Sequence, residues 1–285
     1  MATVEPMKDT LIARDEAREW VTSWGEDLPE VPTNKVIAEV LTRIVDTIIT
    51  QHIKGTLMLS DAQLTFKRRG TKYVVKDLEV LTDYGHDIDV VEVADATSDI
   101  VVVTKGSQAT YGVPDVDGYD NLPDMEMVQK YMRVVCNQTI RTAPEANVGD
   151  MDKRLRANLI VEESLELLML GFGMTLKLNT DKGNVVVDKS EIKGFDVELV
   201  EENKPVDIEF AEEHFIYLNI FAKQIDAIFG IPSDRVILDE VMRANLDKIW
   251  DDGKAHFRED GKNIKPPNHQ PPNIKRVLLA HGWQE

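Results

Sequence analysis

The feature that most constrains the fold of this chain is a series of elements that occurs twice. Residues 36–53 have apolar side chains at helical spacing, and the segment LTFKRRGTKYVV then has β-branched and aromatic arms around a glycine turn. Residues 155–171 form a second apolar helical pattern, and a second hairpin pattern is centred on Lys182-Gly183-Asn184. Each helix–hairpin pair is followed by another apolar helix. The chain therefore predicts an internal duplication.

The two copies agree in register. Asp46 and Glu162 are 116 residues apart, as are Gly55 and Gly171. Beyond the hairpins, Gly112-Val-Pro and Gly230-Ile-Pro are 118 residues apart, and such glycines commonly end helices. A shift of two residues across a loop is small. The alternative is chance agreement between two ordinary helix–hairpin–helix units.

This order of elements predicts a mainly α fold. We expect two tandem four-helix-type units, each with a small β-hairpin, packed against each other as a pseudo-dimer. The predicted domains are residues 1–122 and 123–285. Residues 90–112 are rich in valine, but their length and the closing Gly112 favour a buried helix over a strand. A helix is expected over residues 236–250, followed from Asp251 by a surface loop rich in Gly, Pro, Asn and Lys.

Charge and composition exclude several classes of function. The formal net charge is −18, which disfavours binding to DNA or RNA because such binding requires lysine and arginine to replace counterions. A small polyphosphate ligand is still compatible, since a metal ion reverses the local sign of charge. One cysteine permits neither a disulfide framework nor a cysteine-based zinc site within the chain. We expect a cytoplasmic protein, since no signal-peptide pattern or membrane-spanning run is seen.

Three glutamates stand in an otherwise apolar helical run, LIVEESLELL, at residues 159–168. Positions i, i+1 and i+4 lie within one broad face of a helix, so Glu162, Glu163 and Glu166 can converge on one point. Buried carboxylates repel one another unless a cation compensates them, and a hard divalent ion takes oxygen ligands. The run predicts a metal site. The alternative is an amphipathic helix whose glutamates face water.

A pair of aspartates in the first half has a similar character. Asp95 and Asp99 in VADATSDIVVV are four residues apart, so they share a helix face among apolar neighbours. Aspartate is a poor residue for the middle of a helix, which suggests a role as a ligand. The alternatives are a polar stripe, or Asp95 as a helix cap.

The two acidic sets are complementary between the copies. Asp46, Thr47 and Thr50 stand at the glutamate positions of the first copy, and Glu213 and Tyr217 at the aspartate positions of the second. Each copy keeps one acidic helix. We therefore predict one composite metal site, in which the three glutamates face Asp95 and Asp99. Asp46, Glu213 and Tyr217, at the corresponding positions of the other two helices, would then have a structural role.

Three motifs carry a family resemblance. Residues 155–166 read LRANLIVEESLE, close to the pattern LRxxLIxEExxE, and residues 92–99 read EVADATSD, close to EVADALAD. Residues 240–248 read EVMRANLDK and are followed by DGK at 260–262 and KPP at 265–267. Together they resemble the all-α nucleoside triphosphate pyrophosphatase superfamily, the MazG-like and phosphoribosyl-ATP pyrophosphohydrolase-like group. The resemblance covers most of residues 125–280 and is weaker over residues 15–115.

The resemblance implies a four-helix core and hydrolysis between the α and β phosphates, giving a nucleoside monophosphate and pyrophosphate. It implies Mg²⁺ as cofactor, with Mn²⁺ as an alternative. The residues that it suggests are Glu163 and Glu166 for catalysis, Glu162, Glu163, Glu166, Asp95 and Asp99 for the metal, and Arg243, Asn245, Lys248, Lys262 and Lys265 for the substrate. Family members are usually dimers or tetramers of single units, so a homodimer of pseudo-dimers is an expected assembly.

The chain also departs from the family pattern, which leaves alternatives open. Both acidic motifs normally lie in one unit, in sequence order, whereas here the aspartate motif comes first and in the other copy. If Asp95 and Asp99 did not reach Glu163, then Glu212 or Glu213 would have to complete the metal site. The alternative substrates are phosphoribosyl-ATP and a purine nucleotide such as dGTP. A further alternative is a nucleotide-binding or assembly protein that has lost catalysis.

Overall fold

The computed structural model describes residues 48, 53–59, 61–81, 88–113, 125–232, 236–258 and 263–283. Its helices are α3 (Lys54–Met58), α4 (Val90–Tyr111), α5 (Met125–Val134), α6 (Asp150–Glu166), α7 (Ile208–Ile228), α8 (Val236–Leu246) and α9 (Ile274–Ala280). A π-helical turn, η2 (Leu167–Gly171), continues α6, and η3 (Lys189–Gly194) is a 3₁₀ helix. The strands are β1 (Ala62–Arg68), β2 (Thr71–Leu81), β3 (Thr175–Thr180), β4 (Gly183–Val187), β5 (Phe195–Leu199), β6 (His256–Phe257) and β7 (Asn263–Ile264).

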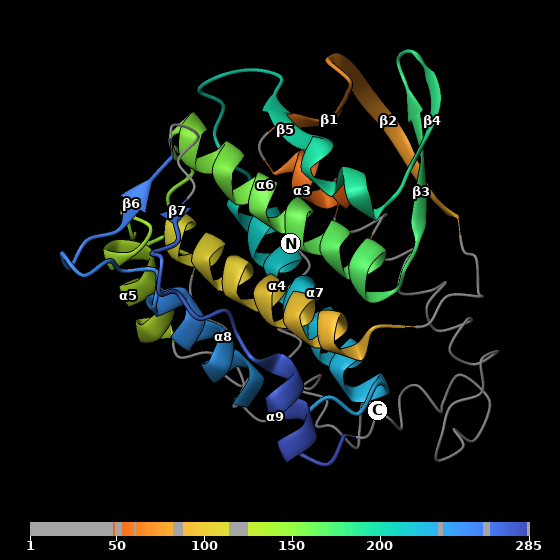
Figure 1. The fold of residues 1–285 in the computed structure, drawn as a ribbon. Helices are drawn as coiled ribbons and strands as arrows, with labels where there is room; N and C mark the ends of the chain where they lie inside the picture. Colours follow the sequence, from red (N-terminus) through yellow and green to blue (C-terminus); the bar gives the residue numbers. More distant parts are fainter. Residues whose placement is uncertain are drawn as a thin grey trace, which may run out of the picture.

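Both predicted hairpins are confirmed. β1 and β2 are antiparallel around Arg69 and Gly70, whose φ angles of 49° and 80° lie in the left-handed region used by tight hairpin turns. β3 and β4 are antiparallel around Lys182 and Gly183. The two hairpins pair with each other along β2 and β3, and β5 adds to β1, so the sheet has the order β4-β3-β2-β1-β5 (Figure 1).

The prediction of a mainly α fold of two tandem four-helix-type units forming a pseudo-dimer is wrong. The described residues are about 50% helical and include a five-stranded antiparallel sheet and a separate two-stranded one. The physical reason is that an isolated hairpin leaves two strand edges unpaired. The hairpins pair along β2 and β3, and β5 pairs with β1, so the strands form one layer instead of two small inserts. The predicted boundary between residues 122 and 123 lies outside the described residues, as does most of the predicted helix at 36–53.

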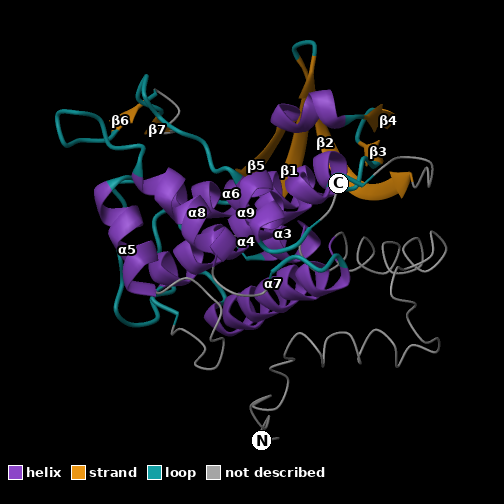
Figure 2. Cartoon of the chain, turned by 60° about the horizontal axis from the view of Figure 1, so that its bottom comes forward, coloured by secondary structure: helices purple, strands orange, loops and turns teal. Residues whose placement is uncertain are grey.

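Helix α4 lies at the centre of the helical layer, where it contacts α5, α6, α7, α8 and α9. Both views place the sheet beside α3 and α6 and away from α5 (Figures 1 and 2). Because neighbours surround α4, apolar and small residues occur on most of its faces, as expected of a buried helix. The predicted helix over residues 90–112 is confirmed. It begins at Asp89, whose carboxylate accepts hydrogen bonds from the backbone N–H groups of Val91 and Glu92.

A side chain of α6 fastens that helix to the edge of the sheet. The Asn158 amide oxygen accepts a hydrogen bond from the Val197 backbone N–H at 2.6 Å, and its amide nitrogen donates to the Asp196 carboxylate at 2.7 Å. β5 is an edge strand, so this asparagine satisfies a backbone donor that no neighbouring strand of the sheet can reach. The contact fixes α6 relative to the sheet.

The chain after α8 is more ordered than the sequence suggested. The predicted helix over residues 236–250 ends at Leu246, and the expected surface loop contains the β6–β7 hairpin and α9. Apolar residues of α9 hold this segment against the core, since Ile274 and Leu278 are buried. Across the described ranges, no helix has the length and apolarity needed to cross a membrane.

Replacing Gly112 by alanine is expected to lower the free energy of unfolding by about 3 kcal/mol. Gly112 has a φ of 70°, and an added Cβ would lie 1.9 Å from the Ala143 carbonyl oxygen. The matched control is Gly230→Ala, because Gly230 has a φ of 64° but open space around it. That control should cost only about 1 kcal/mol of backbone strain. Urea unfolding measures the free energy of unfolding of both variants. Equal losses would show that the backbone at Ala143 moves away from the added Cβ at no cost.

Candidate functional site

Helices α4 and α6 approach each other closely because glycines lie at their contacts. The Asp89 backbone N–H donates to the Gly171 carbonyl oxygen at 3.0 Å. A Cβ on Gly171 would lie 2.8 Å from Val93 Cγ2, and a Cβ on Gly106 would lie 2.7 Å from the Arg156 guanidinium. The start of α4 therefore lies against the end of α6, so the two helices run antiparallel. Their acidic stretches are level with each other.

The carboxyl groups of these stretches interact strongly. Burial raises the pKa of Glu163 well above its usual range, and the charges of Asp99, Glu166, Glu162 and Asp95 raise it further. Burial, followed by the charge of Asp95, raises the pKa of Asp99 to about 7. Burial and the charge of Glu92 raise the pKa of Asp95 to about 6. The structure thus brings together the acids that the sequence proposed from two separate helices.

Two of the predicted lysines lie beside this acidic cluster, which we define as Asp95, Asp99, Glu162, Glu163 and Glu166. Charges on Lys248 and Lys265 lower the pKa values of Asp95 and Asp99, against the larger effect of burial. Lys248 donates to the Asn245 side-chain oxygen at 2.5 Å and lies 5.8 Å from the centre of the Tyr131 ring. Burial lowers its own pKa. Lysine charge therefore lies next to carboxylate charge at the junction of α4, α6 and α8.

The donor set fits a hard divalent cation in its chemistry. All the clustered donors are carboxylate oxygens, and the Asp95 Oδ1 atom is buried without a hydrogen-bond partner. A buried oxygen without a partner is costly, and a cation would satisfy it. Among the described residues, however, no three His, Cys, Asp or Glu side chains are arranged so that they could hold a metal ion. Coordination would therefore require these carboxylates to turn toward a common point.

The second, degenerate acidic set lies elsewhere. Glu212, Glu213 and Tyr217 are on α7, and the carboxylates that act most strongly on Glu163 belong instead to α4 and α6. Between Glu213 and Phe215, His214 is buried and shares a hydrogen bond with Thr56 Oγ1 at 3.2 Å, as expected for a core histidine. Asp46, Thr47 and Thr50 lie outside the described residues. Glu212 and Glu213 are not needed to explain the cluster.

Arg243 makes contacts that fix the C-terminal segment. Its guanidinium donates to both carboxylate oxygens of Glu240, at 2.9 and 3.0 Å, and to the Pro271 carbonyl oxygen at 3.2 Å. Glu240 in turn accepts from the Asn273 backbone N–H at 2.9 Å. This network joins α8 to the residues that precede α9. Lys262, also predicted to bind substrate, lies outside the described residues.

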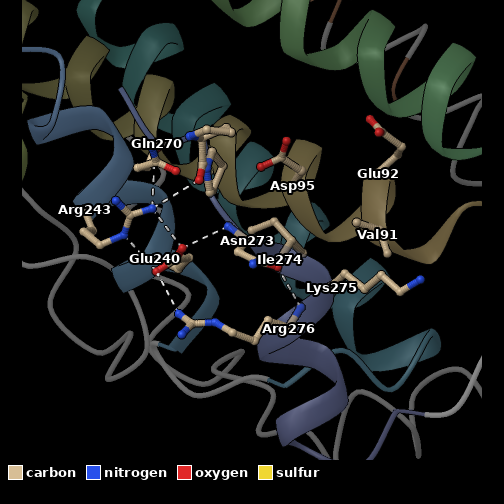
Figure 3. A pocket seen from close by; sticks show the side chains of 12 residues that line it. Val91, Glu92, Asp95, Glu240, Arg243, Gln270, Asn273, Ile274, Lys275 and Arg276 are labelled. Carbon is tan, nitrogen blue, oxygen red and sulfur yellow. Dashed lines mark hydrogen bonds and ion pairs between the residues drawn. The ribbon is translucent and has the colours of Figure 1, made fainter. Parts of the chain in front are cut away.

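A pocket of about 520 Å³ opens beside the acidic cluster. Figure 3 shows Glu92 and Asp95 of α4 on one side, with Arg243 and Glu240 of α8 across from them. The third wall is the segment from Gln270 to Arg276. Asp95 belongs to both the cluster and the pocket, so the two adjoin.

Sequence reasoning missed three side chains at the site. Glu92 precedes Asp95 by three residues and shares its helix face, a spacing that could have identified it. Tyr131 on α5 and His269 in the C-terminal segment gave no such signal. The His269 side chain is 6% exposed, and its Nδ1 atom is 3.7 Å from the Asp247 carboxylate, too far for a hydrogen bond. Burial and the charge of Lys265 lower the pKa of His269.

Comparison with known proteins identifies no relative. No protein-family model, no curated protein and no solved structure matches the chain.

Proposed function

We propose that this protein is a metal-dependent nucleoside triphosphate diphosphohydrolase, which converts a ribo- or deoxyribonucleoside triphosphate and water into the monophosphate and pyrophosphate. One observation carries the proposal. Carboxyl groups from α4 and α6 gather beside Lys248 and Lys265, in a chain whose net charge is −18. Such a mixture of acids and lysines suits a polyphosphate accompanied by divalent cations. The resemblance of residues 155–166, 92–99 and 240–267 to the MazG-like superfamily supports the same activity.

The reaction depends mainly on positioning and charge neutralisation. Asp95, Asp99 and the three glutamates would hold Mg²⁺ or Mn²⁺, which supplies polarisation of the phosphoryl oxygens and a lower pKa for the attacking water. Glu163 or Glu166 would provide the carboxylate oxygen that accepts a proton from the attacking water. Lys248 and Lys265 compensate the negative charge of the phosphates, and Asn245 orients Lys248 through the hydrogen bond between them.

A second candidate is a nucleotide-binding protein without turnover. It is favoured by the absence, within the described part of the chain, of three acidic or histidine side chains arranged to hold a metal ion. The two candidates agree on the ligand and differ in the products. Phosphoribosyl-ATP is the alternative substrate within the enzyme class.

A product assay tests the proposal. The protein is incubated with each ribo- and deoxyribonucleoside triphosphate and with phosphoribosyl-ATP, with Mg²⁺ or with a chelator, and the products are separated by ion exchange. We expect monophosphate and pyrophosphate that form only with the metal. Diphosphate and orthophosphate would mean cleavage of the other phosphoanhydride bond. Binding without products would favour the second candidate, and neither binding nor products would refute both.

A further inference from the structure

We infer that the pocket between α4, α8 and residues 270–276 binds the base and sugar of the nucleotide, while its phosphates lie beside Lys248 and Lys265. The inference rests on the proposed function and adds the location and chemistry of the nucleoside subsite. Neither Lys248 nor Lys265 lines the pocket. Asp95 lines the pocket, and it also interacts with both lysines. A nucleotide whose reacting phosphate lies at the acidic cluster would thus have both the lysines and the pocket within reach.

The charges of the pocket favour a neutral group. Three carboxylates line it, from Glu92, Asp95 and Glu240, and three cations, from Arg243, Lys275 and Arg276, balance them. Arg243 is already engaged by Glu240 through two hydrogen bonds, so its charge is largely compensated. A pyrophosphate group in this space would meet about as much negative as positive charge. Beside Lys248 and Lys265, divalent cations held by the acidic cluster would add positive charge, so the phosphates are better placed there and the base and sugar in the pocket.

The size and walls of the pocket suit a nucleoside. About 520 Å³ falls within the range of roughly 300–1,000 Å³ that is typical of small-molecule sites. The side chains of Val91, Pro271 and Pro272 supply apolar surface against which a planar ring can lie. Polar groups for orientation come from the same walls. Most of the lining is polar or charged, so hydrogen bonds would contribute more than apolar contact to holding the nucleoside.

Arg276 is the group best placed to read the base. Its side chain is 70% exposed at the pocket, and its guanidinium is 3.8 Å from the Glu240 carboxylate, beyond hydrogen-bond distance. Within the described residues its guanidinium makes an ion pair with Glu240 and no hydrogen bond, so its N–H donors can turn toward a ligand. A guanidinium fork matches pairs of acceptor atoms on base edges. Arg276 would therefore bind carbonyl and ring-nitrogen acceptors of the base.

A binding experiment separates the two ends of the nucleotide. A nucleoside triphosphate with a methylene group between its α and β phosphates, tested with each base, and inorganic pyrophosphate are titrated into the full chain with Mg²⁺ by calorimetry. Val91→Trp fills the pocket, Arg276→Ala removes the base contact, and Lys248→Ala removes a phosphate contact. The matched controls are Val186→Trp and Arg154→Ala, whose wild-type side chains are exposed on β4 and α6.

We expect Val91→Trp and Arg276→Ala to weaken binding of the analogue about tenfold or more and to leave the pyrophosphate affinity within about twofold. Lys248→Ala should weaken both ligands, and the controls neither. Pro272→Trp replaces Val91→Trp if the latter disturbs α4.

An equal loss of pyrophosphate and analogue binding in the pocket variants would overturn the inference, because the pocket would then hold phosphates. Unchanged analogue binding in these variants would overturn it while nucleotide hydrolysis still stood. Failure of both ligands to bind the wild-type protein would refute the proposed function as well.

Discussion

Glu163→Gln is expected to lower kcat for nucleotide hydrolysis by about 10²–10⁴-fold and to leave the protein at least as stable as the wild type. Glutamine keeps the shape of the side chain but cannot accept a proton from water or bind a cation as a carboxylate does. Stability should not fall, because burial and the charges of Asp99 and Glu166 already disfavour the ionised form of Glu163. Removing the charge relieves that repulsion. This combination separates a catalytic role from a structural one.

Steady-state kinetics with saturating Mg²⁺ and urea unfolding with a chelator measure the two effects of Glu163→Gln. The matched control is Glu202→Gln, since Glu202 is exposed in the loop after β5. It should change neither quantity. Wild-type turnover in Glu163→Gln would remove Glu163 from the mechanism. A loss of turnover together with a clear loss of stability would mean instead that the carboxylate holds α4 and α6 together.

The elements that the sequence predicted are those with a local signal. The first hairpin has its own turn at Arg69 and Gly70, and α4 has the length of a helix and a closing glycine. The sheet had no such signal, because β2 pairs with β3 through partners such as Leu78 and Leu178, which are far apart in sequence. Strand pairing at that distance depends on tertiary packing. The fold class was therefore wrong although most of its helices and both hairpins were right.

In the candidate site, too, the features with a local sequence signal were predicted and those that depend on tertiary packing were not. Spacing along single helices identified the acids, because residues four apart share a face whatever surrounds the helix. The meeting of the two helices was inferred only from the complementary loss of acids between the copies. Arg243 was expected to contact phosphate, whereas its guanidinium is engaged by Glu240 and by the carbonyl of Pro271. The pocket combines residues 91–95, 240–243 and 270–276, and no periodicity within one segment could reveal it.

Asp99→Asn is expected to stabilise the metal-free protein by an amount that depends on pH. The pKa of Asp99 is raised from 3.8 to about 7 on folding, so between these values the folded state binds more protons than the unfolded state. The free energy of unfolding therefore falls as pH rises through this window. The loss due to ionised Asp99 reaches its full size above pH 7. Asparagine removes this loss. The variant should match the wild type near pH 4 and exceed it by about 2–3 kcal/mol at pH 8, a figure reduced for the charge shared with Asp95.

Urea unfolding from pH 4.5 to 8, with a chelator present, measures this difference. Asp251→Asn is the matched control, since Asp251 is exposed after α8, and it should show no comparable trend. Adding Mg²⁺ at pH 8 should stabilise the wild type and not Asp99→Asn, because binding to the folded state adds stability in proportion to ligand saturation. The prediction would be contradicted if the stability of Asp99→Asn relative to the wild type increased toward low pH. That result would mean that Lys248 and Lys265 hold Asp99 as a favourable ion pair, and that the acidic cluster does not need a metal to balance its charge.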